Sequence, residues 1–314
     1  MGSGARYVPA NIAPAANVGI DEEYILRLSG KLNERPLYAP DDWNKRAVGT
    51  KRHPASYRQN LPLPDDLIFE DARPGNTPNN CVAFILPDGR TVVNLAPFTR
   101  VEKGGPAYAW DFGDTDLYGD GVRGSHGATG LSAIGGSIRK GELTGKTPIR
   151  HAIKVNVFAE KNLSYNDGGT RGYRWPATSA DSYAANSYRS KNREMEAGAL
   201  LAIPPAIKEA DLGLKTPVGR KLFAALQDYG AYIVDDAAWD CHYICAEVGV
   251  NEEIKTTHGY DLHMNNGDYK ADVNKLFAAL SVVTNNGTKS VGGGGAPRQP
   301  PAPPLILPTA IRVR

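Results

Sequence analysis

Residues 81–95 read CVAFILPDGRTVVNL, and this stretch decides the fold class. Two runs rich in apolar and β-branched residues, 81–86 and 91–95, flank the turn sequence PDGR at 87–90. β-Branched residues favour strands, and Asp-Gly between two strands is typical of a hairpin turn. The stretch therefore predicts a two-stranded hairpin.

Further strands are expected at 149–158, 200–203, 231–234 and 239–246. Three helices are expected, at 21–28 with an acidic first turn, at 216–230 between a Thr-Pro start and a glycine, and at 273–280. Many short strands, few helices and abundant turn residues favour a mainly β fold. The specific prediction is an antiparallel, jelly-roll-like β-sandwich with a few short helices and long ordered loops.

The chain has 314 residues, of which 41% are hydrophobic, so it can bury a sizeable core. Small residues and prolines over 1–19 indicate an extended N-terminal arm. Residues 20–288 are expected to form a single β-sandwich domain. The Gly- and Pro-rich stretch at 289–314 indicates a linker or tail, through which further modules could be joined.

Charge and motifs exclude several classes of function. A balance of 36 basic and 34 acidic residues predicts no nucleic-acid partner. No apolar run approaches the roughly 20 residues of a membrane helix, and no signal peptide is visible. The common motifs of nucleotide-binding loops, dinucleotide folds, serine hydrolases and zinc proteases are missing.

Three cysteines cannot form a disulfide framework. Cys241 and Cys245 would share one face of a strand, and either could pair with Cys81 if the chain is exported. Buried thiols are the alternative.

Carboxylates cluster in DFGDTDLYGDG at 111–121, where Asp111, Asp114, Asp116 and Asp120 precede a glycine. Oxygen ligands in such a stretch suit calcium, so Asp114, Asp116 and Asp120 are candidate ligands of a structural ion. No cofactor is otherwise required. A catalytic role for Asp120, or solvated turn residues throughout, are the alternatives.

Two histidines are candidate acids or bases. His126 lies among glycines in GSHGATG, where a substrate could approach it, and a metal-ligand role is also open. His151 opens the strand expected at 149–158 and is either a core histidine or the floor of a cleft.

The segment GYRWPATSADSYAANSY at 172–188 holds aromatic residues beside short polar ones, which suits sugar recognition. Tyr173, Trp175 and Tyr183 would form the platform, although Trp175 before a proline could instead be a packing corner. Asp235 and Asp236 follow a predicted strand, so one could enter a cleft while the other caps a turn. A turn role for both is the alternative.

Four segments in order, GLSAIGGSIRKGEL, IRHAIKVNV, YRWPA and YGAYIVDDAAW, resemble a largely uncharacterised family of secreted bacterial and fungal β-sandwich proteins associated with carbohydrate-active modules. The resemblance covers roughly residues 20–285 and implies an extracellular or cell-surface location. The matching positions are His151, Trp175, Tyr229, Asp235 and Trp239. The chain departs from the family at 125–127, where SHG replaces an expected aspartate, so Asp120 or His126 would have to take its place.

These features favour a polysaccharide-active module, most simply a glycoside hydrolase with Asp235 and Asp120 as its carboxylate pair. Either His126 or His151 would tune one of these two aspartates, and both histidines are therefore candidate catalytic residues. The candidate substrate-binding residues are Trp175, Tyr173, Tyr183, Tyr229 and Arg150.

Two alternatives remain. A polysaccharide lyase would use a His or Tyr base, with Arg150 or Arg123 neutralising a uronate. A carbohydrate-binding or extracellular structural or filament protein would need no catalysis. In each case the expected partner is a polysaccharide or oligosaccharide.

Overall fold

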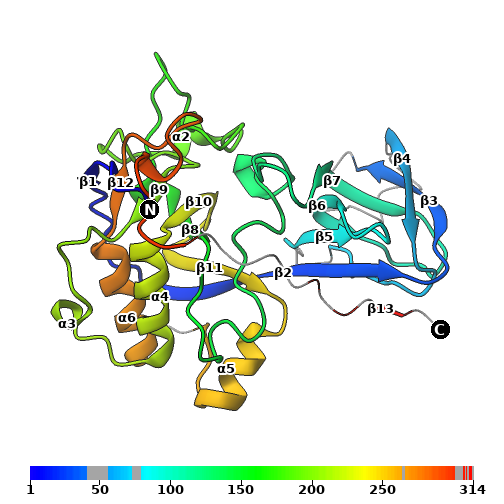
Figure 1. Cartoon of the computed structure of the whole chain (residues 1–314). Coiled ribbons are helices and arrows are strands. Elements are labelled where there is room, and N and C mark those ends of the chain that lie inside the picture. Colours follow the sequence, from blue (N-terminus) through cyan, green and yellow to red (C-terminus); the bar gives the residue numbers. More distant parts are fainter. Residues whose placement is uncertain are drawn as a thin grey trace. The chain divides into compact units, whose positions relative to one another are not determined.

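A computed structural model describes residues 1–40, 56–72, 79–263, 266–300, 307, 309 and 311–312. The chain forms two compact units, each assembled from separate stretches of sequence (Figure 1). Unit 1 comprises Met1–Glu22, Gly127–Leu131 and Gly135–Leu305, and unit 2 comprises Glu23–His126, Ser132–Ile134 and Ile306–Arg314. From the sequence we expected a single domain over 20–288 and did not expect a division into two units.

The strands of unit 1 follow the spatial order β1–β12–β9–β10–β8–β11. Their pairing is mixed, because β10 and β8 run parallel whereas β9 and β11 pair antiparallel to them. The bounds are β1 (Tyr7–Pro9), β12 (Ser281–Val283), β9 (Leu200–Ala202), β10 (Ala231–Asp236), β8 (Ile153–Val157) and β11 (Cys241–Glu247).

The strands of unit 2 follow the spatial order β2–β5–β6–β7–β3–β4. The first residues of β2, up to Glu22, belong to unit 1. β5, β6 and β7 pair antiparallel, whereas β2 with β5 and β3 with β7 run parallel. β13 (Ile311–Arg312) pairs parallel with β2. The other bounds are β2 (Asn17–Ser29), β5 (Cys81–Ile85), β6 (Thr91–Thr99), β7 (Ala107–Asp116), β3 (Asn33–Ala39) and β4 (Ser56–Leu63).

The helices of the described residues lie in unit 1. Two of them, α4 (Pro217–Asp228) and α6 (Gly267–Ala278), lie side by side and send Leu222 and Phe277 into the main core with Val155 of β8. The others are α1 (Ala159–Asn162), α2 (Ala184–Ser187), α3 (Glu209–Leu212), α5 (Val250–His258) and the 3₁₀ turns η2 (Gly127–Thr129) and η3 (Val291–Gly293).

The structure confirms the hairpin, the strands at 200–203 and 231–234, and the helices at 216–230 and 273–280. The strand expected at 149–158 is shorter, and the one at 239–246 begins at Cys241. The fold is mainly β as expected. The antiparallel sandwich is not confirmed, because the sheet contains three parallel pairings of long strands.

The helix predicted at 21–28 is wrong, since these residues belong to β2. Their acidic side chains mimic the first turn of a helix, but each has a distant partner. Asp21 accepts a hydrogen bond from Asn156, Glu22 accepts one from the backbone of Gly249, and Glu23 pairs with His126. Tertiary contacts therefore override the local pattern.

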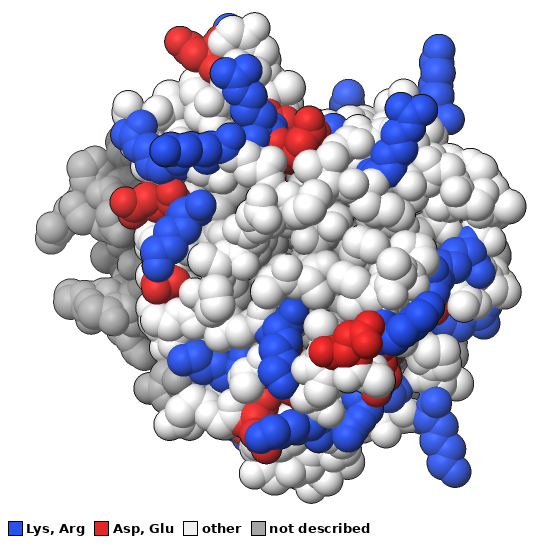
Figure 2. Space-filling model, turned by 90° about the vertical axis from the view of Figure 1, so that its left-hand side faces the viewer, with Lys and Arg blue, Asp and Glu red and all other residues white. Residues whose placement is uncertain are grey.

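All three cysteines are buried thiols, and among the described residues none forms a disulfide. No helix in the described part of the chain is long and apolar enough to cross a membrane. On the face seen in Figure 2, basic side chains surround an uncharged central area and are interspersed with fewer acidic ones.

Thr216 caps α4 and also reaches the fully buried Asp272 of α6. Its Oγ1 accepts the Gly219 N–H at 2.9 Å and donates to Asp272 Oδ2 at 2.7 Å. Replacing Thr216 with alanine should therefore lower the free energy of unfolding by about 1–2 kcal/mol, measured by chemical denaturation. Thr256→Ala, at an exposed position inside α5, is the matched control and should be nearly neutral; equal losses in both variants would contradict the capping role.

Candidate functional site

Three segments of unit 1 meet at the C-terminal end of β10. The turn η2 is joined to β10 by Thr129, whose Oγ1 donates to the Val234 carbonyl at 2.7 Å. The segment leading into α2 is joined to η2 by Ser179, whose Oγ donates to the Ala128 carbonyl at 2.7 Å. These contacts bring together a group of side chains that we call the aspartate cluster: Asp181, Tyr183, Tyr188, Asp235 and Asp236.

Asp235 is held by backbone groups. Its Oδ1 accepts the N–H of Ala128 at 3.1 Å and that of Asp236 at 2.8 Å. Gly127 leaves room for this carboxylate, because a Cβ at that position would lie 1.9 Å from Asp235 Oδ2. The glycine-rich GSHGATG segment therefore serves to admit an acidic side chain.

Asp236 is held in a similar way on the other side. Its Oδ1 accepts the N–H of Ala159, at the start of α1, and that of Ala238, both at 2.9 Å. Its Oδ2 accepts the hydroxyl of Tyr183 at 3.2 Å. Both carboxylates thus cap backbone N–H groups, and the second oxygen of Asp236 accepts the Tyr183 hydroxyl of the cluster.

A register shift in β10 helps to bring these adjacent residues to one place. The pairing with β8 skips a residue between Ile233 and Asp235. Such irregularities re-aim side chains that would otherwise alternate strictly across the sheet.

Asp181 completes the cluster. Its Oδ2 accepts the Tyr188 hydroxyl at 2.8 Å. Burial raises the pKa of Asp181 above its ordinary value, and the nearby charge of Asp236 raises it further, although hydrogen bonds from Tyr188 and Tyr183 act in the opposite direction. A proton is therefore retained more readily on Asp181 than on an exposed aspartate.

The Tyr183 hydroxyl donates to Asp236 Oδ2 at 3.2 Å, and the Tyr188 hydroxyl donates to Asp181 Oδ2 at 2.8 Å. The charge of Asp236 also raises the pKa of Asp181, so the two carboxyl groups interact. Burial, followed by the charges of the aspartates, raises the pKa of Tyr183 and of Tyr188. Both tyrosines therefore act as neutral hydrogen-bond donors.

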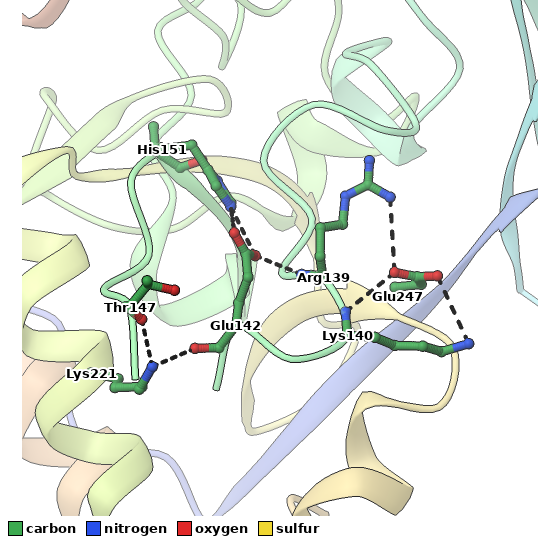
Figure 3. Close-up of polar contacts among 8 residues, drawn as sticks. Arg139, Lys140, Glu142, Thr147, His151, Lys221 and Glu247 are labelled. Carbon is green, nitrogen blue, oxygen red and sulfur yellow. Dashed lines mark hydrogen bonds and ion pairs between the residues drawn. The ribbon is translucent and has the colours of Figure 1, made fainter. Parts of the chain in front are cut away.

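A second polar network surrounds Glu142 (Figure 3). Its carboxylate accepts the Arg139 N–H at 2.7 Å and lies 3.1 Å from His151 Nε2. Lys221 of α4 donates to the carbonyls of Glu142 and Thr147, both at 2.7 Å. This network anchors the loop before β8 to α4.

His151 lies at the edge of that loop, half-buried, rather than within β8. Its Nδ1 faces the Ala152 carbonyl at 2.9 Å, and Nε2 faces Glu142. An imidazolium donates to both acceptors at once. The contacts favour a positioning role for His151.

His126 is not the exposed loop histidine that the glycines suggested. It is only 1% exposed, and its Nε2 lies 2.6 Å from Glu23 Oε1. Asp120 is exposed in unit 2, where its Oδ1 accepts the Val122 N–H at 3.0 Å. Since Asp235 belongs to unit 1, the pair Asp120–Asp235 stays a prediction.

The candidate calcium ligands lie on and after a strand rather than in one loop. Asp114 and Asp116 belong to β7, and Asp116 forms an ion pair with Arg90 at 2.6 Å. In the described part of the chain, these carboxylates are not among the groups whose ligand atoms converge. Calcium binding stays a prediction.

The candidate sugar-binding residues differ in exposure. Tyr173 packs against the main core of unit 1, Trp175 and Arg150 are half-buried, and the Tyr229 hydroxyl donates to the Pro300 carbonyl at 2.9 Å. Tyr183 and Trp239 are 42% and 49% exposed.

Asp181, Asp236 and Tyr188 were not selected as site residues from the sequence. The stretch SADSYAANSY carried the signal, because its acidic and aromatic residues alternate with small ones. The sequence alone does not reveal that the chain, after roughly 50 more residues, returns to the same place at Asp235 and Asp236.

Replacing Gly127 with alanine should destabilise the protein by roughly 1–3 kcal/mol and displace Asp235, since the new Cβ would clash with its carboxylate. Chemical denaturation measures the effect. Gly259→Ala is the matched control, because Gly259 also has a positive φ but has nothing within 4 Å of the added Cβ. An equal cost in both variants would show that backbone strain alone explains the effect.

Glu142 should make stability fall in acid. Burial opposes its ionisation, but the hydrogen bond and charge of His151 outweigh burial and lower its pKa below the ordinary value of 4.5. A depressed folded-state pKa contributes stability that is present above the unfolded pKa and is lost as pH falls through the folded one. Unfolding free energies between pH 7 and pH 3 should therefore fall less in Glu142→Gln than in the parent.

Glu160→Gln, at an exposed position in α1, is the control and should keep the parental slope. A Glu142→Gln protein with the parental pH dependence would contradict the pairing with His151.

Searches with the whole chain found no matching family model, curated protein or solved structure. Function is therefore argued from the geometry of the site.

Proposed function

We propose that the protein is a polysaccharide-active glycoside hydrolase whose carboxylate pair lies in unit 1. The observation that carries this proposal is the pair of interacting carboxyl groups: Tyr188 donates to Asp181, Tyr183 donates to Asp236, and the charge of Asp236 raises the pKa of Asp181. Glycosidases use two carboxyl groups about 5–10 Å apart, one protonated and one ionised. The electrostatic interaction of Asp181 with Asp236 supports their assignment as such a pair.

The environments of the two residues suggest their roles. Asp181 is the general acid, because burial raises its pKa and favours the protonated form. Asp236 is the second carboxyl group of the pair, oriented by two backbone N–H groups and the Tyr183 hydroxyl that donate to it. Asp235, held beside them, supplies further negative charge to stabilise an oxocarbenium-like transition state.

The same contacts favour hydrolysis over elimination. A lyase needs a basic tyrosine or histidine, yet the pKa of Tyr183 and that of Tyr188 are raised. His126 is buried against Glu23, and both ring nitrogens of His151 face oxygen acceptors.

A non-catalytic carbohydrate-binding module is the second candidate. The exposed rings of Tyr183 and Trp239 favour it, since flat apolar faces stack on sugars. Both functions suit an extracellular or cell-surface location, and that location is part of the proposal because it rests on the resemblance and on the linker-like tail.

The full-length protein should release reducing ends from at least one polysaccharide of a broad panel, without the ultraviolet absorbance of unsaturated sugars. On that substrate, Asp181→Asn and Asp236→Asn should each lower kcat by roughly 10²–10⁴-fold. In the parent, activity should fall as pH rises through the raised pKa of Asp181, because the acid must be protonated.

Asp167→Asn, at an exposed loop position of unit 1, is the control and should retain full activity. Loss of activity in Asp120→Asn with retention in Asp181→Asn would move the pair back to Asp120 and Asp235. Binding without turnover on every glycan would favour the second candidate.

A further inference from the structure

Unit 2 contains a group of potential metal ligands that the proposed hydrolase does not use. The group consists of Glu23, Cys81 and His126, each of which belongs to unit 2 and is buried. Their exposed fractions are 0%, 5% and 1%. One carboxylate oxygen, one thiol sulfur and one imidazole nitrogen all lie within 4.8 Å of one another.

The strand register accounts for two of the three ligands. Glu23 of β2 and Cys81 of β5 are direct partners across the parallel pair. Cross-strand partners project to the same face of a sheet, so the pairing of β2 with β5 makes the two side chains neighbours. His126, at the end of the loop that follows β7, brings its Nε2 to 2.6 Å from Glu23 Oε1.

Burying a carboxylate completely is costly unless an opposite charge or a metal compensates it. An ion pair with His126 provides one form of compensation, and a metal ion bound by the carboxylate, the imidazole and the neighbouring thiol would provide another. A thiolate, an imidazole and a carboxylate are the donors that Zn²⁺ takes in proteins. Zn²⁺ would also cancel the two negative charges of Glu23 and an ionised Cys81.

We propose that Glu23, Cys81 and His126 form a binding site for a divalent transition-metal ion, best suited to Zn²⁺. Binding replaces hydrogens by the metal: the Cys81 S–H bond breaks and its proton goes to solvent, and the proton between His126 Nε2 and Glu23 leaves for Nδ1 or solvent. The ion then joins β2, β5 and the loop after β7. Three protein ligands leave a fourth position for water.

The test uses tag-free full-length protein that has been stripped with a chelator. Equilibrium dialysis against Zn²⁺ should give one bound ion per chain and raise the thermal unfolding midpoint, because a ligand of the folded state stabilises it. Co²⁺ in place of Zn²⁺ should give the visible bands of a tetrahedral site and a thiolate-to-cobalt charge-transfer band.

Cys81→Ala should abolish the charge-transfer band and weaken Zn²⁺ binding by at least roughly 100-fold. Loss of a residue that only supports a metal ligand weakens binding by roughly 10–100-fold, so a direct ligand should cost at least as much. Cys241→Ala, which removes a buried thiol of β11, is the matched control and should change neither signal. No bound metal in the parent, or a charge-transfer band that persists in Cys81→Ala, would overturn the proposal. Neither readout depends on hydrolytic activity.

Discussion

Three aspartates, Asp181, Asp235 and Asp236, gather near the end of β10, and keeping these acidic groups so close is the constraint on which unit 1 depends. Like charges a few ångströms apart repel strongly in a partly buried setting. The protein offsets this with the four backbone N–H groups that donate to Asp235 and Asp236, with the tyrosine hydroxyls, and with the raised pKa of Asp181, which favours its protonated form. Each of these donors comes from a segment that the fold must place accurately.

The sheet of unit 1 provides that placement. β10 pairs with β8 on one side and β9 on the other, and α4 and α6 contribute to the core that packs with these strands. Carboxylates on the end of such a strand are held more precisely than carboxylates on a loop. The Glu142 network belongs to the same support, since Lys221 and His151 tie the loop before β8 to the helix α4.

Local signals predicted much of this architecture. The PDGR hairpin and the Thr-Pro start of α4 carry their own turn and capping chemistry, so neighbouring residues were sufficient to predict them. β2 was missed because Asp21, Glu22 and Glu23 are compensated by residues more than 100 positions away. The sequence pointed to the adjacent Asp235 and Asp236 and favoured Asp235 as the catalytic one. Asp181 was not selected, because only the folded chain brings the 178–188 segment to the end of β10. His126 was expected to be exposed because glycines flank it in the sequence. Its burial depends on a contact with Glu23, which the local sequence does not show.

The central claim is that Asp181 and Asp236 share one electrostatic site. Carboxyl-carbon NMR titration of Asp181, in the parent and in Asp236→Asn, tests it most directly. The account predicts a parental Asp181 pKa above the ordinary value of 3.8 and a lower pKa in the variant, because the neighbouring charge is gone. An Asp181 that titrates at the ordinary value and does not respond to the substitution would contradict the account.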